Sequence, residues 1–292
     1  MSYEIVKNYR RNETLRNSFN YLAKETFCGL DFEPWYQTGF WNEKYIPYSV
    51  VKDETVIANV SVNLIDCTLN SAAKHYIQLG TVMTDKNYRN QGYSRILMEE
   101  VLKDFSDCDG FYLYANDEVL DFYPKFGFVK TDEYRFRTNI DQAEKTSSFA
   151  KPVPMKNKED WTNFLNKKEN LKSNGIIQFD TDDLLMFYLT QFMQDNVFFI
   201  ESLNAYAIAE QEDDVLILHE VFSEKPVDLI TVCQSFENVK TVEFAFTPSN
   251  IESIQNLEKY KYEEEDTTFF TLGGTITSDL QTILSFPQIT HA

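Results

Sequence analysis

The residue types that could do chemistry gather first in the stretch Tyr88-Arg89-Asn90-Gln91-Gly92-Tyr93-Ser94. This stretch stands between an apolar segment, residues 77–83, and a segment whose apolar residues have helical spacing, residues 92–105. The N–H groups at the start of a helix have no partner within the helix, and together with an arginine they attract anions. Residues 89–94, which we call the cradle, are therefore predicted to bind a pyrophosphate.

A second set of candidates follows the next apolar segment of the chain. It consists of Asn116 and of the run Phe122-Tyr123-Pro124-Lys125-Phe126-Gly127-Phe128. A tyrosine has an ordinary pKa of about 10, so it is protonated at neutral pH and can give a proton to a leaving group. Tyr123 could instead serve only in packing, but the phenylalanines beside it already supply apolar contacts. Packing alone therefore does not account for Tyr123, which is a candidate for a chemical role.

A scaffold of strands and helices must position these residues. The order of strand 77–83, helix 92–105 and strand 111–115 is that of a crossover unit, whose two strands are parallel and adjacent. Ligands bind at the carboxyl ends of such strands, where the cradle and Asn116 stand. The other elements predicted for this half are helices over 13–26 and 118–126 and strands over 48–52, 56–65, 75–84 and 128–137. The sequence predicts an α/β (α+β) fold with a mixed, mostly antiparallel sheet, one parallel crossover pair and flanking helices.

The second half of the chain repeats this order of elements. It is predicted to contain helices over 160–168, 183–193, 227–236 and 250–260 and strands over 197–203, 205–210, 215–222, 241–246 and 267–272. At the place of the cradle, however, it has Ser223-Glu224-Lys225-Pro226, and a glutamate there opposes anion binding. The run Lys151-Pro152-Val153-Pro154 is typical of a linker. We predict an active domain over residues 1–145 and a degenerate copy without a cradle over residues 146–292.

Composition and charge exclude several classes of function. The chain has 292 residues and a net charge of −19, which opposes contact with the backbones of nucleic acids. The acidity could attract a cationic amine substrate, although solubility alone explains it. The chain shows no signal sequence and no apolar run of membrane-spanning length, so we expect a cytoplasmic protein without a membrane partner.

Histidines and cysteines give no sign of a metal site. The four cysteines lie far apart in the sequence and lack the spacing of metal ligands, so buried thiols are expected. His75 is expected on the surface and His219 in the core or at an interface. We predict no metal cofactor.

The residues of the first half resemble the GNAT superfamily of acetyl-CoA-dependent N-acetyltransferases. The family's cradle motif, Arg/Gln-x-x-Gly-x-Gly/Ala, stands here as Arg89-Asn90-Gln91-Gly92-Tyr93-Ser94, with Ser94 as one small residue in place of another. The later Asn116 and Tyr123 resemble its second signature. The resemblance covers residues 1–140 well and the second half only as a degenerate repeat.

The resemblance implies both an activity and a set of contacts. The cradle would bind the pyrophosphate of acetyl-CoA, Val82 and Met83 would hydrogen-bond its pantetheine arm in the manner of a strand, and Asn116 would complete the cofactor site. Tyr123 would be the general acid. The implied reaction is direct transfer of acetyl from acetyl-CoA to an amine of a small molecule or peptide.

Several alternatives stay open at this point. The strand before the cradle offers Gln78 and Thr81 but no carboxylate, so the base could be Asp31, Glu33, Asp85 or water. We favour water, with Glu33 or Asp31 orienting the amine. The alternative function is a non-enzymatic acyl-CoA-binding or sensor module. The acyl-chain preference, the acceptor and a possible homo-oligomer are left open.

Overall fold

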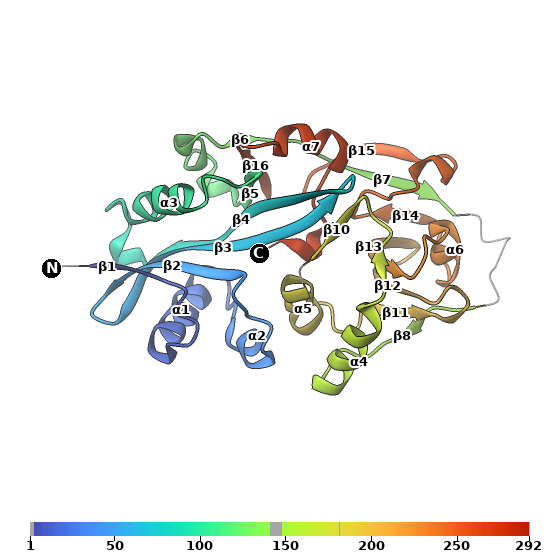
Figure 1. Cartoon of the computed structure of the whole chain (residues 1–292), viewed down its shortest axis with the longest axis horizontal. Coiled ribbons are helices and arrows are strands. Elements are labelled where there is room, and N and C mark those ends of the chain that lie inside the picture. Colours follow the sequence, from blue (N-terminus) through green and yellow to red (C-terminus); the bar gives the residue numbers. More distant parts are fainter. Residues whose placement is uncertain (1–2, 141–147, 181, 292) are drawn as a thin grey trace.

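The computed structural model, which describes residues 3–140, 148–180 and 182–291, contains two eight-stranded sheets that lie side by side (Figure 1). We call them sheet A and sheet B. From edge to edge, sheet A contains β1 (Glu4–Lys7), β2 (Tyr45–Lys52), β3 (Thr55–Leu69), β4 (Ala72–Thr84), β5 (Gly110–Ala115), β16 (Thr268–Leu272) and β6 (Val129–Lys130), with β10 (Ile177–Phe179) beside β3. Sheet B contains β15 (Glu258–Tyr262), β7 (Glu133–Asn139), β14 (Thr241–Phe244), β13 (Val215–Ser223), β12 (Ala205–Glu212), β11 (Val197–Ile200) and β8 (Lys151–Pro152), with β9 (Lys172–Ser173) beside β13.

Each sheet has one parallel pair among antiparallel neighbours. The parallel pairs are β4–β5 in sheet A and β13–β14 in sheet B. Within each pair a helix connects the two strands, as the crossover pattern in the sequence predicted. The predicted fold class, two tandem units with mixed, mostly antiparallel sheets and flanking helices, is confirmed.

Helices cover both faces of sheet A. Helix α3 packs on one face, and helices α1, α2 and α5 lie toward the other (Figure 1). The α-helices are α1 (Glu13–Thr26), α2 (Glu33–Thr38), α3 (Tyr93–Asp104), α4 (Lys158–Lys168), α5 (Asp182–Gln191), α6 (Leu229–Gln234) and α7 (Ile276–Ile283). Short 3₁₀ segments are η1 (Lys86–Tyr88), η2 (Asp117–Val119), η3 (Tyr123–Phe126), η4 (Glu201–Leu203), η5 (Ile251–Ser253) and η6 (Gln288–Thr290). None of the helices described is both long and apolar enough to cross a bilayer.

Helix α1 shows how local sequence fixes an element. It begins at Glu13 because the side chain of Asn12 accepts a hydrogen bond from the Leu15 N–H group, as N-cap residues do. Its apolar residues recur at helical spacing and are buried on one side, where Phe19 and Leu22 belong to the same cluster as the aromatic residues of α2 and β2. The helix predicted over residues 13–26 is therefore confirmed.

The two sheets exchange strands, which the sequence did not predict. Strand β7 follows the first crossover unit yet belongs to sheet B, whereas β16, near the end of the chain, lies between β5 and β6 in sheet A. Strand β10 also joins sheet A from the second half. Residues 145 and 146, the predicted domain boundary, lie outside the described residues, and the division into 1–145 and 146–292 stays a prediction.

The helix predicted over residues 250–260 is wrong. This segment forms only the short η5 and then enters strand β15, which pairs antiparallel with β7. In β15 lysines and tyrosines alternate, and Tyr260 and Tyr262 lie against the guanidinium groups of Arg137 and Arg135. These cross-strand contacts favour a strand over the helical spacing of the residues before it.

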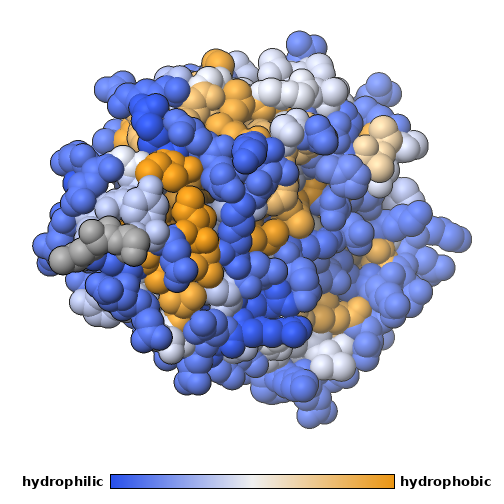
Figure 2. Space-filling model, turned by 60° about the vertical axis from the view of Figure 1, so that its left-hand side comes forward, coloured by the Kyte–Doolittle hydropathy of each residue, from blue (hydrophilic) through white to orange (hydrophobic). Residues whose placement is uncertain are grey.

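The face shown in Figure 2 is mainly hydrophilic, in keeping with the net charge of −19. On the face shown in Figure 2, apolar residues form separate bands between hydrophilic ones rather than one broad patch.

A glycine pair anchors helix α7 beside β5. The N–H groups of Thr275 and Ile276 donate to the Asp109 carbonyl at 2.7 and 3.2 Å, and a Cβ on Gly274 would stand only 1.8 Å from that oxygen. Gly274 also has a φ of +57°. We expect Gly274→Ala to lower the free energy of unfolding by about 3 kcal/mol, because clash and backbone strain add.

Gly273→Ala is the matched control in urea unfolding. Gly273 also has a positive φ, but a Cβ there would meet no atom within 4 Å. Only backbone strain applies, so we expect a loss of about 1 kcal/mol. Equal losses of unfolding free energy in Gly274→Ala and Gly273→Ala would contradict the close approach of Gly274 to the Asp109 carbonyl.

Candidate functional site

Strands β4 and β5 separate next to the cradle. They pair only from Tyr76–Gly110 to Leu79–Leu113, while β4 continues to Thr84. A register shift between β3 and β4 and a positive φ at Thr81 mark a bulge just after the last pair. In the described part of the chain, the edge of residues 80–84 that faces β5 has no strand partner, so an extended ligand can pair with it. We call this opening the cleft.

The cradle joins the end of β4 to helix α3 in the conformation that anion binding requires. Asn90 and Gly92 have positive φ angles of 61° and 84°, and Gly92 is the N-cap of α3 without a capping side chain. The first turn of α3 contains no acidic residue, so its positive end is not neutralised locally. The hydroxyl groups of Thr84 and Ser94 lie 2.7 Å apart and tie the strand to the helix.

The other cradle residues are accessible. Arg89, Asn90 and Gln91 are exposed, and Tyr93 is half-buried. The Arg89 Nε donates to the Thr84 carbonyl at 3.3 Å, which leaves the rest of the guanidinium facing solvent. The cradle therefore combines free backbone N–H groups with an exposed cation.

Val82 and Met83 lie on β4 along the cleft. Val82 is half-buried, and the Met83 side chain is buried in the cluster formed by α1, α2 and β2. Met83 pairs with Asn59 on the β3 side. Only backbone groups on the β5 side of this segment are free to meet a ligand.

Asn116 is exposed at the end of β5, on the other side of the cleft. Its side-chain amide donates to the Asp266 carboxylate at 2.8 Å, and the Asp117 N–H group donates to the same carboxylate at 2.7 Å. The side chain thus ties β5 to the turn before β16. Its predicted role in cofactor binding would be additional to this contact.

Tyr123 begins η3 and packs on the α3 side of sheet A. It is 4% exposed, and its ring contacts Phe128 and Phe270 with centroid distances of 6.2 and 5.8 Å. Burial raises the pKa of Tyr123 to about 12. The ring is therefore part of the core, while the phenol stays protonated throughout the physiological pH range.

The carboxylates of Asp31 and Glu33 are already engaged by cations from helix α1. Lys24 Nζ lies 2.8 Å from Asp31 Oδ2, and Arg16 Nε donates to Glu33 Oε2 at 2.8 Å. Burial alone would raise the pKa of Glu33, but hydrogen bonds from Arg16 and Gln37 outweigh it and lower this pKa. Glu33 is therefore a weak base that holds α2 against α1.

Replacing Glu33 tests this structural contact. The Arg16 side chain is 7% exposed, so Glu33→Gln leaves a buried cation without its counter-charge, and we expect a loss of about 2 kcal/mol in unfolding free energy at pH 7. Because the folded pKa of Glu33 is lowered, this stabilisation is present above about pH 4.3 and is lost as the pH falls through the folded pKa. Urea unfolding of both proteins at pH 7 and pH 3 measures the difference, and a difference that stays constant with pH would contradict the ion pair.

The corresponding opening in sheet B is filled by the chain itself. Strands β13 and β14 stop pairing after Leu218–Phe244, but residues 172–176 enter between their ends. The Asn174 N–H group donates to the Val221 carbonyl at 2.8 Å, and the Ile176 N–H group donates to the Thr247 carbonyl at 2.9 Å. Sheet B therefore has no free edge for a ligand at this place.

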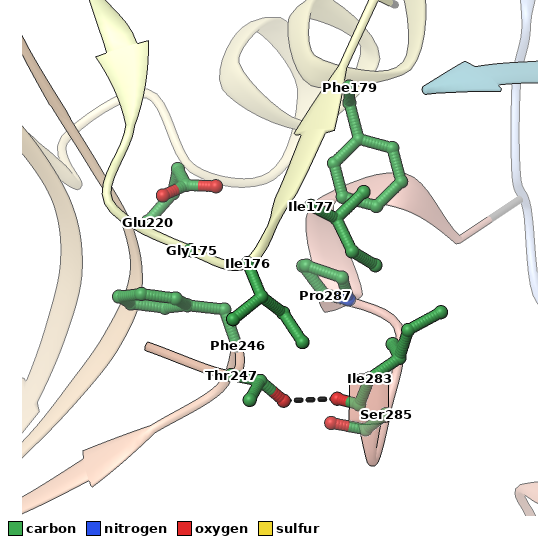
Figure 3. Close-up of a pocket in the computed structure, with 10 residues that line it drawn as sticks. All are labelled: Gly175, Ile176, Ile177, Phe179, Glu220, Phe246, Thr247, Ile283, Ser285 and Pro287. Atoms are coloured by element: carbon green, nitrogen blue, oxygen red, sulfur yellow. Dashed lines mark hydrogen bonds between the residues drawn. The ribbon is translucent and has the colours of Figure 1, made fainter. Parts of the chain in front are cut away.

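Figure 3 shows Gly175 and Ile176 between Glu220 on one side and Phe246 and Thr247 on the other. The cavity that these residues line is about 10 Å³, enough for one water molecule at most. Glu224 indicated from the sequence that the cradle is lost in the second half. The sequence gave no sign that residues 172–176 fill the opening, because they pair with segments far away in the chain.

Histidines and metal-ligating groups add nothing to this site. His75 is exposed and pairs with Asp66, and His219 is buried in sheet B. Within residues 3–140, 148–180 and 182–291, no three His, Cys, Asp or Glu side chains are arranged to hold a metal ion.

Comparison with known protein families gives a match in the part of the chain that contains the cleft. A family model described as "Acetyltransferase (GNAT) family" matches residues 14–128. No curated protein matches the chain.

Solved structures resemble the chain over most of its length. A probable N-acyltransferase from Enterococcus faecalis V583 is 12% identical, with a TM-score of 0.63 and coverage of 93% of this chain and 72% of that one. A GCN5-related N-acetyltransferase from Kribbella flavida is 14% identical, with a TM-score of 0.56 and coverage of 92% and 71%. A putative acetyltransferase from Pyrococcus horikoshii is 12% identical, with a TM-score of 0.50 and coverage of 99% and 96%. At these identities the likeness shows a common fold.

Proposed function

Because residues 14–128 match the model of the acetyltransferase (GNAT) family, we propose that this chain is an N-acetyltransferase that transfers acetyl from acetyl-CoA to an amine of a small molecule or peptide. The observation that carries the proposal is the contrast between the two sheets. The β4–β5 cleft of sheet A is open and ends at a cradle, whereas the equivalent place in sheet B is filled.

Acetyl-CoA suits the cleft and the cradle together. The backbone N–H groups of Arg89, Asn90, Gln91, Gly92, Tyr93 and Ser94 would hold its pyrophosphate at the positive end of α3. The free edge of β4 at Val82 and Met83 would hydrogen-bond the pantetheine amides, and Asn116 would close the site from β5. This arrangement brings the thioester to the point where β4 and β5 separate.

In the proposed reaction the amine attacks the thioester carbonyl, a C–N bond forms and the C–S bond breaks. Tyr123, which its raised pKa keeps protonated, would hydrogen-bond the departing sulfur and give it the phenolic proton, and the resulting tyrosinate would regain a proton from water. The proton of the amine would pass to water. Holding amine and thioester together would supply much of the rate.

Asp31 and Glu33 would contribute negative charge that orients the amine. Each is already paired, so an incoming ammonium group would have to compete with Lys24 or Arg16. This competition agrees with water, rather than either carboxylate, as the proton acceptor. In this proposal residues 1–145 carry the chemistry, and residues 146–292 support and shape the acceptor side.

The test is a transfer assay with purified protein, acetyl-CoA and a broad panel of amines. We expect release of free CoA together with an acetylated amine in mass spectrometry. A protein that bound acetyl-CoA but released no CoA with any amine would instead be an acyl-CoA-binding or sensor module. A protein that did not bind acetyl-CoA would exclude both functions.

A further inference from the structure

Two buried carboxamides beside the cleft have no hydrogen-bond partner among the residues that the structure describes. Asn63 on β3 and Gln78 on β4 stand directly opposite each other in the antiparallel pair. They are 1% and 0% exposed, and neither the amide oxygen nor the amide nitrogen of either residue finds a partner among the described residues. Buried amides are nearly always paired, so two adjacent unpaired ones indicate an absent partner.

Both side chains point to the face of sheet A opposite helix α3. Their neighbours along the strands, Val62 and Leu79, belong to the cluster under α3, so strand alternation turns Asn63 and Gln78 the other way. Tyr112 on β5 stands opposite Gln78 and belongs to the cluster on that other face. Helix α5 and the C-terminal segment cover this face, and the C-terminus lies beside sheet A in Figure 1.

The pair lies next to the place where the proposed reaction would occur. Gln78 is one residue before the last β4–β5 pair, Leu79–Leu113, and two residues before Gly80, where the cleft opens. Two residues along a strand span about 6.6 Å, which a small acceptor molecule can bridge. A molecule that touches Gln78 can therefore present an amine to the cleft.

Asn59, on the same face of β3, is a buried asparagine whose side chain is hydrogen-bonded within the protein. Its amide oxygen accepts from Ser49 at 2.8 Å, and its amide nitrogen donates to Ser61 and to the Thr81 carbonyl, both at 2.9 Å. On the same strand, the side-chain amide of Asn59 thus has hydrogen bonds at both its oxygen and its nitrogen, whereas that of Asn63 has none.

We propose that Asn63 and Gln78 bind the acceptor, and that the acceptor carries an uncharged amide or hydroxyl group near its reactive amine. This inference rests on the proposed acetyltransferase function. Carboxamides donate and accept hydrogen bonds, so they recognise a group that does both. The residues paired across the sheet in this row are Tyr45, Asn63, Gln78, Tyr112, Thr271 and Val129. This row contains no cation that would favour a carboxylate.

The first test separates a binding role from a structural one. Asn63→Leu and Gln78→Met replace the amides by apolar groups of similar size, and they should leave the melting temperature unchanged or raised, because an unpaired buried amide is removed. Asn59→Leu is the matched control, and it should lower the melting temperature because its partners lose their bonds. A lowered melting temperature in the Asn63 and Gln78 variants would overturn the proposal and assign these amides a structural role.

The second test compares three amines of similar size: glycinamide, glycine and propylamine. The wild type should prefer glycinamide at least about tenfold in kcat/KM, and Gln78→Met should lower kcat/KM for glycinamide at least about tenfold. The KM for acetyl-CoA should stay within about twofold, because the cradle is untouched. Equal use of the three amines, no turnover of any of them, or an unchanged Gln78→Met variant would overturn the substrate class. Failure to bind acetyl-CoA would instead overturn the proposed function.

Discussion

Arg89→Glu is expected to weaken acetyl-CoA binding by at least about 100-fold, which corresponds to about 2.7 kcal/mol. A charge-assisted hydrogen bond to a phosphate contributes about 1.5–3 kcal/mol, and a carboxylate at the same place adds repulsion. Arg89 is exposed and bonds the chain only through its Nε atom, so the fold should tolerate the change. Isothermal titration calorimetry with acetyl-CoA measures the affinity, and a melting curve confirms folding.

Lys225→Glu is the matched control for this charge reversal. Lys225 stands in the loop that joins β13 to α6, the counterpart of the cradle in sheet B, and it is exposed. Because the chain itself fills the opening in sheet B, this variant should bind acetyl-CoA as the wild type does. An Arg89→Glu affinity within about threefold of wild type would show that the pyrophosphate binds elsewhere.

Tyr123→Phe is expected to lower kcat about 100-fold or more while leaving stability nearly unchanged. The ring that packs against Phe128 and Phe270 is kept, and only the hydroxyl group is lost. General acid catalysis typically contributes a factor of about 100 to 10,000. Steady-state assays of CoA release give kcat, and full turnover in the variant would remove Tyr123 from the acid role.

The pH profile gives a second measure of Tyr123. Its folded pKa is about 12, so the phenol remains protonated across the usual assay range and should cause no alkaline loss of kcat below pH 11. Tyr48→Phe is the matched control. Tyr48 is equally buried, but its hydroxyl donates at 2.9 Å to Asp104, at the end of α3 that lies away from the cradle, so its loss should lower stability and leave kcat unchanged.

Sequence patterns predicted those parts of this protein that depend on neighbours along the chain. The helix of residues 13–26 follows from a capping asparagine and one apolar stripe, and the cradle follows from a glycine and an arginine between a strand and a helix. The parallel β4–β5 pair also follows, because a strand, a helix and a strand in sequence leave few ways to connect.

The sequence could not decide which strands lie together across the two halves. The short apolar and β-branched run of β16 marks a strand, but it does not say that this strand enters sheet A between β5 and β6. For residues 258–260 the spacing even predicted a helix, and only the contacts with β7 make them part of strand β15. Pairing partners depend on the packing of whole sheets, which local patterns do not contain.

The cleft shows most clearly which features the local sequence determines and which depend on the tertiary structure. From the sequence alone, the cradle marks the first half as the part that should bind a pyrophosphate, because helix termini and glycine conformations are local properties. Tertiary structure decides that the second opening is filled by residues 172–176 and that Asn63 and Gln78 meet without partners beside the first. Both facts arise from hydrogen bonds between segments far apart in the chain, and such bonds form only when the sheets are assembled.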